Sequence, residues 1–397
     1  MRSLYILIIC LAFMIAGCGG GGGGDGVSNN APLISGTPTT YQKEGTYSFT
    51  PSATDADSDS LAWSIANKPG WANFDTSTGK LSGTATAGVY KDITITVSDG
   101  TDNDSVKFDL SIVTWVLTKT GQTTSYADYD DGYYQKGTDS YFSRSEPVAG
   151  EFVVTDNLNG LMWQDDLTAG TTTATGDTAA SVCTSLNLSI YGGYTDWRLP
   201  DIDEIESLES FGTVPSINPV MVNTALNYYW SSTAYAFNAL VAWAVYTESG
   251  FIDADSVTSS YNVMCVRGNS NSAGNYERDD TSKTVTDKRT GLIWQDEAVS
   301  STMTWSAAIT YCEDKTLGGY SDWRLPNSRE LASIVDRSQN HPAISSVFDN
   351  TASNHYWSST TDVSDVGNAW YASFDDGVVR TIGKVGNYYV RCVRGGK

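Results

Sequence analysis

Three aspartates at alternate positions, Asp55, Asp57 and Asp59, could place carboxylate oxygens around a metal ion. Carboxylate oxygens are preferred ligands of Ca²⁺, and alternate residues of an extended segment project to the same side. The same spacing is also typical of an acidic, solvated turn. The sequence therefore allows calcium at this triplet and requires no other cofactor.

Cys18 ends a short apolar run and is a candidate for lipid attachment. Residues 4–15 are nearly all apolar but too few to span a bilayer, as in a secretory signal. Ala16-Gly17-Cys18 resembles the lipobox of bacterial lipoproteins, which implies lipid on the cysteine sulfur and cleavage before it; an ordinary signal with an incidental cysteine is the alternative. Residues 19–30 begin with six glycines and predict a flexible tether.

This signal predicts a lipid-anchored chain outside the cytoplasm, with the membrane as one partner. Gly19 is not the aspartate that resembles an inner-membrane retention signal, so a Gram-negative source would favour the outer membrane or the cell surface. The formal net charge of −22 repels nucleic acid, which we exclude as a partner, and disfavours sulfated polysaccharide.

Residues 31–114 predict an all-β domain. Short β-rich runs at 46–49, 61–65, 93–97 and 106–113 are separated by turn residues at sandwich spacing. The residues at 54–59, 68–71, 74–83 and 95–100 resemble the Ig-like and cadherin-like domains of bacterial surface proteins. This resemblance implies a spacer or an adhesive module.

The rest of the chain is an internal duplication. Five blocks recur in one order with a nearly constant separation, so each copy is a whole domain. The pairs are GLMWQDD at 160–166 and GLIWQDE at 291–297, GGYTDWRLP at 192–200 and GGYSDWRLP at 318–326, YWSST at 229–233 and 356–360, AW at 242–243 and 369–370, and CVRG at 265–268 and 392–395.

Each copy is expected to be α+β. Helices are predicted at 178–186 and 202–210 in copy one, and at 305–315, after Thr304 as N-cap, and 328–336 in copy two. Asp201 with Glu204, and Asn327 with Glu330, have the spacing of capping boxes.

Four cysteines remain beyond the signal, and export places them in an oxidising space. Three pairings are formally possible, and the duplication favours Cys183–Cys265 and Cys312–Cys392. Each bridge would stabilise its copy by roughly 4 kcal/mol. A metal or redox site is the weaker alternative, because no CxxC occurs and the chain has two histidines.

The repeated blocks resemble the Lcl C-terminal domain family over about 117–268 and 275–396. The resemblance implies a C-type-lectin-like fold, and adhesion or binding of glycan or glycosaminoglycan. The acidity argues against glycosaminoglycan binding, and the missing Glu-Pro-Asn and Trp-Asn-Asp signatures argue against a calcium-lectin mechanism. The expected fold is multidomain, an all-β Ig-like/cadherin-like sandwich followed by two α+β C-type-lectin-like domains. The expected divisions are 1–18, 19–30, 31–114, 115–270 and 271–397.

The eight repeated tryptophans favour a framework role over sugar stacking, and Asp196 with Arg198, like Asp322 with Arg324, is expected to form an ion pair. The copies diverge at 244–264 and 371–391, where ligand contacts or neutral drift are the two interpretations. The ligand-binding candidates are Tyr246, Glu248, Phe251, Asp253, Tyr261, Tyr371, Phe374, Asp375, Arg380, Tyr388 and Tyr389.

The sequence favours a non-enzymatic adhesin or ligand-binding protein, with a glycan or protein ligand outside the cell. No nucleophile–base motif stands out, and neither histidine recurs in the other copy. A polysaccharide-acting enzyme that uses carboxylates and a structural envelope protein are the alternatives.

Overall fold

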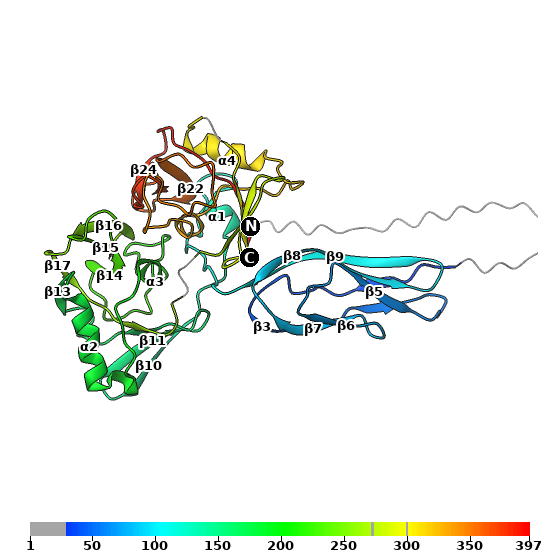
Figure 1. Ribbon diagram of the computed structural model, residues 1–397, viewed down its shortest axis with the longest axis horizontal. Coiled ribbons are helices and arrows are strands. Elements are labelled where there is room, and N and C mark those ends of the chain that lie inside the picture. The colour runs from blue at the N-terminus through cyan, green and yellow to red at the C-terminus, as the bar shows by residue number, and fades with distance from the viewer. Residues whose placement is uncertain (1–28, 271–273, 299–300) are drawn as a thin grey trace, which may run out of the picture.

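The computed structural model describes residues 29–270, 274–298 and 301–397, which are mostly strand with a few short helices. An elongated β-domain leads into two further domains that lie side by side (Figure 1). Cys18 and residues 19–28 lie outside the described residues, so the lipid anchor stays a prediction. Among the helices of the described ranges, none combines the length and apolar composition that crossing a membrane needs.

The first domain is a sandwich of two sheets, ordered β2-β9-β8-β5 and β3-β7-β6, with β1 paired to β4. Ile93, Ile95 and Val97 alternate along β8 and are completely buried, so the period of two predicted from sequence forms the core. The strands are β1 Leu33–Ser35, β2 Tyr41–Lys43, β3 Gly45–Phe49, β4 Ser52–Thr54, β5 Ala62–Ala66, β6 Ala72–Asp75, β7 Lys80–Ala85, β8 Gly88–Ser98 and β9 Asn103–Val113.

Residues 118–138, which we name the strap, follow the sandwich and carry helix α1, Asp131–Tyr134. The strap falls inside the division expected for copy one, 115–270, but it precedes the strands of that copy and packs on copy two. The side-chain oxygen of Gln122 accepts a hydrogen bond of 2.9 Å from the backbone of Thr361. The strap therefore ties copy two to the part of the chain that precedes copy one.

Both copies combine short helices with two groups of strands. Copy one contains β10 Phe142–Val148, β11 Glu151–Asp156, β12 Met162–Gln164, β13 Thr173–Thr175, α2 Ala179–Ser189, η1 Tyr191–Gly193, α3 Ile202–Glu206, β14 Tyr228–Ala234, β15 Val241–Tyr246, β16 Phe251–Ser256, β17 Ser260–Asn262 and β18 Val266–Arg267. Copy two contains β19 Tyr276–Asp279, β20 Thr284–Asp287, β21 Leu292–Gln295, α4 Trp305–Glu313, α5 Ser328–Ala332, β22 His355–Thr361, β23 Asn368–Ser373, β24 Val379–Gly383 and β25 Val393–Gly395.

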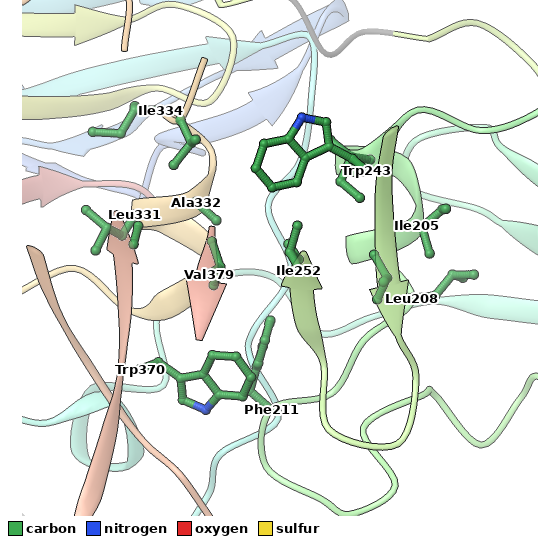
Figure 2. Close-up of a cluster of buried hydrophobic side chains, with 14 of the residues drawn as sticks. Ile205, Leu208, Phe211, Trp243, Ile252, Leu331, Ala332, Ile334, Trp370 and Val379 are labelled. Atoms are coloured by element: carbon green, nitrogen blue, oxygen red, sulfur yellow. The ribbon is translucent and has the colours of Figure 1, made fainter. Parts of the chain in front are cut away.

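Each copy closes a small sheet of its own, ordered β10-β11-β12-β18 or β19-β20-β21-β25. The remaining strands of both copies form one eight-stranded sheet, ordered β13-β17-β14-β15-β16-β24-β23-β22. The copies join where Ile252 of β16 pairs with Val379 of β24 (Figure 2). Each of these residues is the ninth after the tryptophan of its AW block, so equivalent strands meet across a pseudo-twofold axis.

Both predicted disulfides are present. Cys183 of α2 bonds to Cys265 and Cys312 of α4 bonds to Cys392, closing sequence separations of 82 and 80 residues. Each bond links the first helix of a copy to the start of its last strand. The two copies therefore have the same covalent framework, each with its own disulfide.

Both predicted capping boxes are also present, at Asp201 with Glu204 and at Asn327 with Glu330. Thr304 is the N-cap of α4, but its side chain makes no capping hydrogen bond.

The ion pair predicted between Asp196 and Arg198 is wrong. Arg198 binds the carboxylate of Glu204 through two hydrogen bonds of 2.6 and 2.7 Å, and Asp196 binds Arg267 at 2.7 Å. The capping box holds Glu204 in a buried position, where a carboxylate needs a cation beside it. Copy two repeats the arrangement with Arg324 on Glu330 and Asp322 on Arg394.

Candidate functional site

The strand register brings the divergent segments of both copies to one face of the eight-stranded sheet. Ile252 and Val379 pair directly and are buried on the core face. The next residue of each strand, Asp253 or Arg380, therefore points to the opposite face, because side chains alternate along a strand. Tyr371 is paired with Arg380 and shares that side. We name this side of the sheet the intercopy face.

Copy one contributes a row of four aromatic rings to this face. The ring of Tyr228 is stacked between those of Tyr246 and Tyr261, with centroid distances of 4.7 and 4.8 Å. Tyr261 continues the row to Trp230, at 4.8 Å. The three tyrosines are partly exposed and offer a flat apolar surface flanked by hydroxyl groups, whereas Trp230 is fully buried and ends the row in the core.

Copy two builds a similar row on its side of the axis. His355 lies 4.4 Å from Tyr371 and 5.4 Å from Tyr388, and Tyr388 lies 5.0 Å from Trp357. Three members of this row are at positions equivalent to members of the first row, since His355, Tyr388 and Trp357 correspond to Tyr228, Tyr261 and Trp230. The two rows are therefore related by the pseudo-twofold axis.

An ion pair joins the two halves of the face. Arg380 of copy two binds the carboxylate of Asp253 of copy one. The Asp253 side chain is 10% exposed and the Arg380 side chain 49% exposed, so the pair lies at the surface with its acid partly covered. Burial raises the pKa of Asp253, and the guanidinium of Arg380 opposes that rise.

The aromatic groups of the face are uncharged at neutral pH. Burial raises the pKa of Tyr261 to about 12 and also raises the pKa of Tyr228 and of Tyr371. A hydrogen bond to Glu248 raises the pKa of Tyr246. Burial lowers the pKa of His355, which keeps its imidazole neutral. Arg380 is thus accompanied by neutral rings and by carboxylates.

Six of the eleven candidate residues lie on the intercopy face: Tyr246, Asp253, Tyr261, Tyr371, Arg380 and Tyr388. Glu248 lies at its rim, where it accepts a hydrogen bond from the hydroxyl of Tyr246.

The structure places the other four candidates elsewhere. Phe374 is fully buried and packs edge-to-face on Tyr356 at 4.8 Å, so it has no surface to offer a ligand. Phe251 is paired with Tyr246 at the start of β16, but its ring packs on Trp370 of the core at 5.6 Å. Asp375 binds His341 at 2.6 Å, and Tyr389 stacks on Tyr356 at 5.4 Å.

The central ring of each row, Tyr228 or His355, is absent from the sequence-based candidates. Both residues lie immediately before the YWSST block, outside the segments that diverge most. Each is two residues before a repeated tryptophan and therefore on the same side of its strand. Strand alternation is thus a sequence signal that could have identified both.

The repeated tryptophans have the predicted framework role. Trp163, Trp230, Trp243, Trp294 and Trp357 are completely inaccessible to solvent. The other three, Trp197, Trp323 and Trp370, are at most 3% exposed.

The aspartate triplet of the sandwich is a second candidate site. Ligand atoms of Asp55, Asp57 and Asp59 lie within 4.8 Å of one another. One oxygen of Asp55 accepts hydrogen bonds from the backbones of Asp57 and Asp59, at 2.8 and 3.2 Å. Its other oxygen is buried and has no hydrogen-bond partner. Three converging carboxylates with a free buried oxygen fit a hard cation such as Ca²⁺.

The chain thus combines a β-sandwich with a duplicated, disulfide-bonded unit whose two copies share an aromatic face. Residues 152–267 and 283–394 each match the Lcl C-terminal domain model, and residues 31–113 match the model described as "Putative Ig domain". Because the first model covers more than half of the chain, the chain belongs to the Lcl C-terminal domain family. Together these domains suggest a surface adhesin-like protein.

Comparison with curated proteins found no match. Among solved structures, two proteins from Bacteroides fragilis, described as "a putative alpha-galactosidase" and "a putative alpha-galactosidase/melibiase", are 16% and 17% identical, each with a TM-score of 0.18 over 25% of this chain. The chain spans about a fifth of the length of each, since 21% of either is covered. Invasin, a bacterial integrin-binding protein, is 12% identical with a TM-score of 0.17, over 91% of this chain and 79% of its own. These similarities carry no argument about fold or function.

Proposed function

We propose that this chain is a lipid-anchored adhesin-like protein that binds a glycan outside the cell at the intercopy face. The observation that carries the proposal is the convergence of both copies on that face. Two rows of aromatic rings flank one ion pair, Asp253 with Arg380. A site made of two copies could not form in either copy alone.

The chemistry of the face favours a neutral or weakly charged glycan. Aromatic rings pack on the apolar sides of sugar rings, while phenol and carboxylate oxygens pair with sugar hydroxyls. Asp253 and Asp255 bring negative charge to the face, and Arg380 already binds Asp253. Strongly anionic chains, including sulfated polysaccharides, are therefore expected to bind poorly.

A glycan and protein array probed with the full chain tests this proposal. The full chain is needed because the sandwich contacts copy two, where the hydroxyl of Tyr41 donates to the carbonyl of Thr290 at 3.2 Å. We expect neutral glycans to be captured without product formation. Capture of a protein alone would assign a protein ligand to the chain, and turnover of a labelled polysaccharide would support a carboxylate-based enzyme instead.

Variants connect capture to the face. Tyr228→Ala and Asp253→Asn should each lower capture at least about tenfold, which corresponds to about 1.4 kcal/mol, and leave the melting temperature within about 3 °C. Phe237→Ala is the matched control, because Phe237 is 52% exposed and takes no part in the ring rows. Unchanged capture by both face variants, or equal loss in the control, would contradict the proposed site.

The anchor and the calcium site complete the proposal. Labelled palmitate should enter the wild type and not Cys18→Ala, and equal labelling would reject the anchor. Millimolar calcium should release heat and raise the melting temperature through the aspartate triplet. Asp55→Asn should remove both effects, whereas an unresponsive wild type would leave the triplet a solvated turn.

A further inference from the structure

The strap carries an exposed cluster of tyrosines on the surface of copy two. Tyr126, Tyr129 and Tyr133 are 38%, 43% and 54% exposed. The rings of Tyr129 and Tyr133 meet edge-to-face at 5.2 Å, and Tyr133 meets Tyr134 in the same way at 5.1 Å. These aromatic groups are displayed close together, although the proposed glycan site does not use them.

Buried carboxylates beneath the cluster hold it in place. Asp130 is fully buried and accepts hydrogen bonds from the backbones of Tyr126 and Tyr133, at 2.7 and 2.9 Å. Asp131 accepts from the hydroxyl of Thr360 in copy two, at 2.7 Å. A Cβ on Gly132 would lie 2.0 Å from a backbone oxygen, so the turn requires glycine there. The tyrosines are therefore pre-organised, which lowers the entropy cost of binding.

The charge around the cluster is negative. Asp128 and Asp314 are exposed, and Glu313 accepts a 2.8 Å hydrogen bond from the hydroxyl of Tyr134. Glu313 and Asp314 also end helix α4, where the helix dipole adds partial negative charge. Aromatic faces and carboxylates attract the same class of group, a cation.

One ring of the cluster already takes a cation from the chain itself. The ammonium of Lys384 lies 3.9 Å from the centroid of Trp305 and 5.5 Å from the centroid of the Tyr126 ring, so Tyr126 is the outer of the two rings around it. We propose that the tyrosine cluster of the strap is a second docking surface, which binds a cationic segment of a partner protein through Tyr129 and Tyr133. The surface is separate from the intercopy face and needs no glycan.

Titration of the full chain with a labelled tetra-arginine peptide tests this surface. Tyr129→Ala combined with Tyr133→Ala should weaken binding about five- to tenfold, since each exposed cation–π contact contributes a two- to fivefold effect. The corresponding double Phe variant should bind as the wild type, because the ring and not the hydroxyl holds the cation. Asp128→Asn should weaken binding about twofold.

Tyr141→Ala is the matched control, because Tyr141 is 63% exposed and outside the cluster. Wild-type binding by the double Ala variant would show that net charge alone attracts the peptide and would overturn the proposal. Loss of peptide binding in the double Phe variant, or cluster-dependent binding of a neutral oligosaccharide in place of the peptide, would also overturn it. The glycan-site variant Tyr228→Ala should still bind the peptide, so the two proposals fail separately.

Discussion

Copy one and copy two place opposite charges at equivalent positions of their contact. Asp253 corresponds to Arg380, and the two residues bind each other. Asp203 of α3 corresponds to Arg329 of α5. Arg329 is buried and donates to the backbone carbonyl of Glu206 in copy one, at 2.9 Å. At both positions the acid belongs to copy one and the base to copy two.

The tryptophans of the two AW blocks also have different partners at equivalent positions of the contact. Phe211 of copy one packs edge-to-face on Trp370 of copy two at 4.7 Å (Figure 2). Arg337, which is equivalent to Phe211, lies 5.3 Å from the ring of Trp243. Two identical copies would bring like charges together across the axis, which is unfavourable. The divergence therefore makes the contact specific for copy one with copy two, while the framework of each stays the same.

Removing either disulfide tests the shared framework and should have the largest effect. The bridges close loops of nearly equal length, with separations of 82 and 80 residues. Replacing both cysteines of one pair by serine should lower the free energy of unfolding by about 4 kcal/mol. Denaturant unfolding of the two double variants should give losses within about 1 kcal/mol of each other. A marked inequality would show that the copies do not share one framework.

Converting one contact residue to its counterpart tests the difference between the copies. Arg337→Phe should lower the free energy of unfolding by about 2 kcal/mol, because Asp203 loses the guanidinium that donates to it at 2.8 Å. The arginine side chain is 2% exposed, so water cannot replace it easily. Lys288→Ala, which removes a surface ion pair with Glu277, is the control and should change stability by less than about 1 kcal/mol. Equal losses of stability in Arg337→Phe and Lys288→Ala would show that the contact between the copies contributes no more than a surface ion pair.

Local patterns predicted the elements well and their ends less well. The capping boxes at Asp201 and Asn327 identified the starts of α3 and α5, but both helices stop after five residues, at Glu206 and Ala332. Both helices were expected to continue, to residues 210 and 336, but beyond Glu206 and Ala332 the chain turns toward the contact between the copies. Helix ends depend on such tertiary packing, which a single sequence does not display.

The sequence identified several residues that lie on the intercopy face, but it did not show how the two copies bring them together. Divergence between the copies identified Asp253 and Arg380, yet nothing local indicates that equivalent strands pair with each other. That pairing rests on one register match, Ile252 with Val379. Two adjacent apolar strands can join in several registers with similar burial. From the sequence alone, segments 244–264 and 371–391 therefore look like two separate sites, and the structure shows that one continuous sheet joins them.

The carboxylates of copy one at this contact predict a pH dependence, and copy two has no carboxylate at the equivalent positions. Glu206 and Glu209 correspond to Ala332 and Val335. Burial raises the pKa of Glu206 to about 7 and of Glu209 to about 8, while Arg329 opposes both shifts. A raised folded-state pKa means that the folded chain binds the proton more tightly than the unfolded chain. The stability contribution is therefore complete below about pH 4.5 and is lost as the pH rises through 7 to 8.

Urea unfolding at pH 5.5, 7.0 and 8.5 measures this loss. The free energy of unfolding should fall by up to about 1.4 kcal/mol per pH unit for each carboxyl group that titrates in this range. Glu209→Gln should reduce the slope, most of all between pH 7.0 and 8.5, because the amide is neutral at every pH and can still accept the hydrogen bond from Ser216, while Glu206 and Asp131 still titrate. Glu277→Gln, at an exposed position, should keep the wild-type slope. A wild-type stability that rises with pH would mean that these carboxylates are ionised and paired in the folded chain, and the acidic half of the contact would then hold by attraction to the arginines.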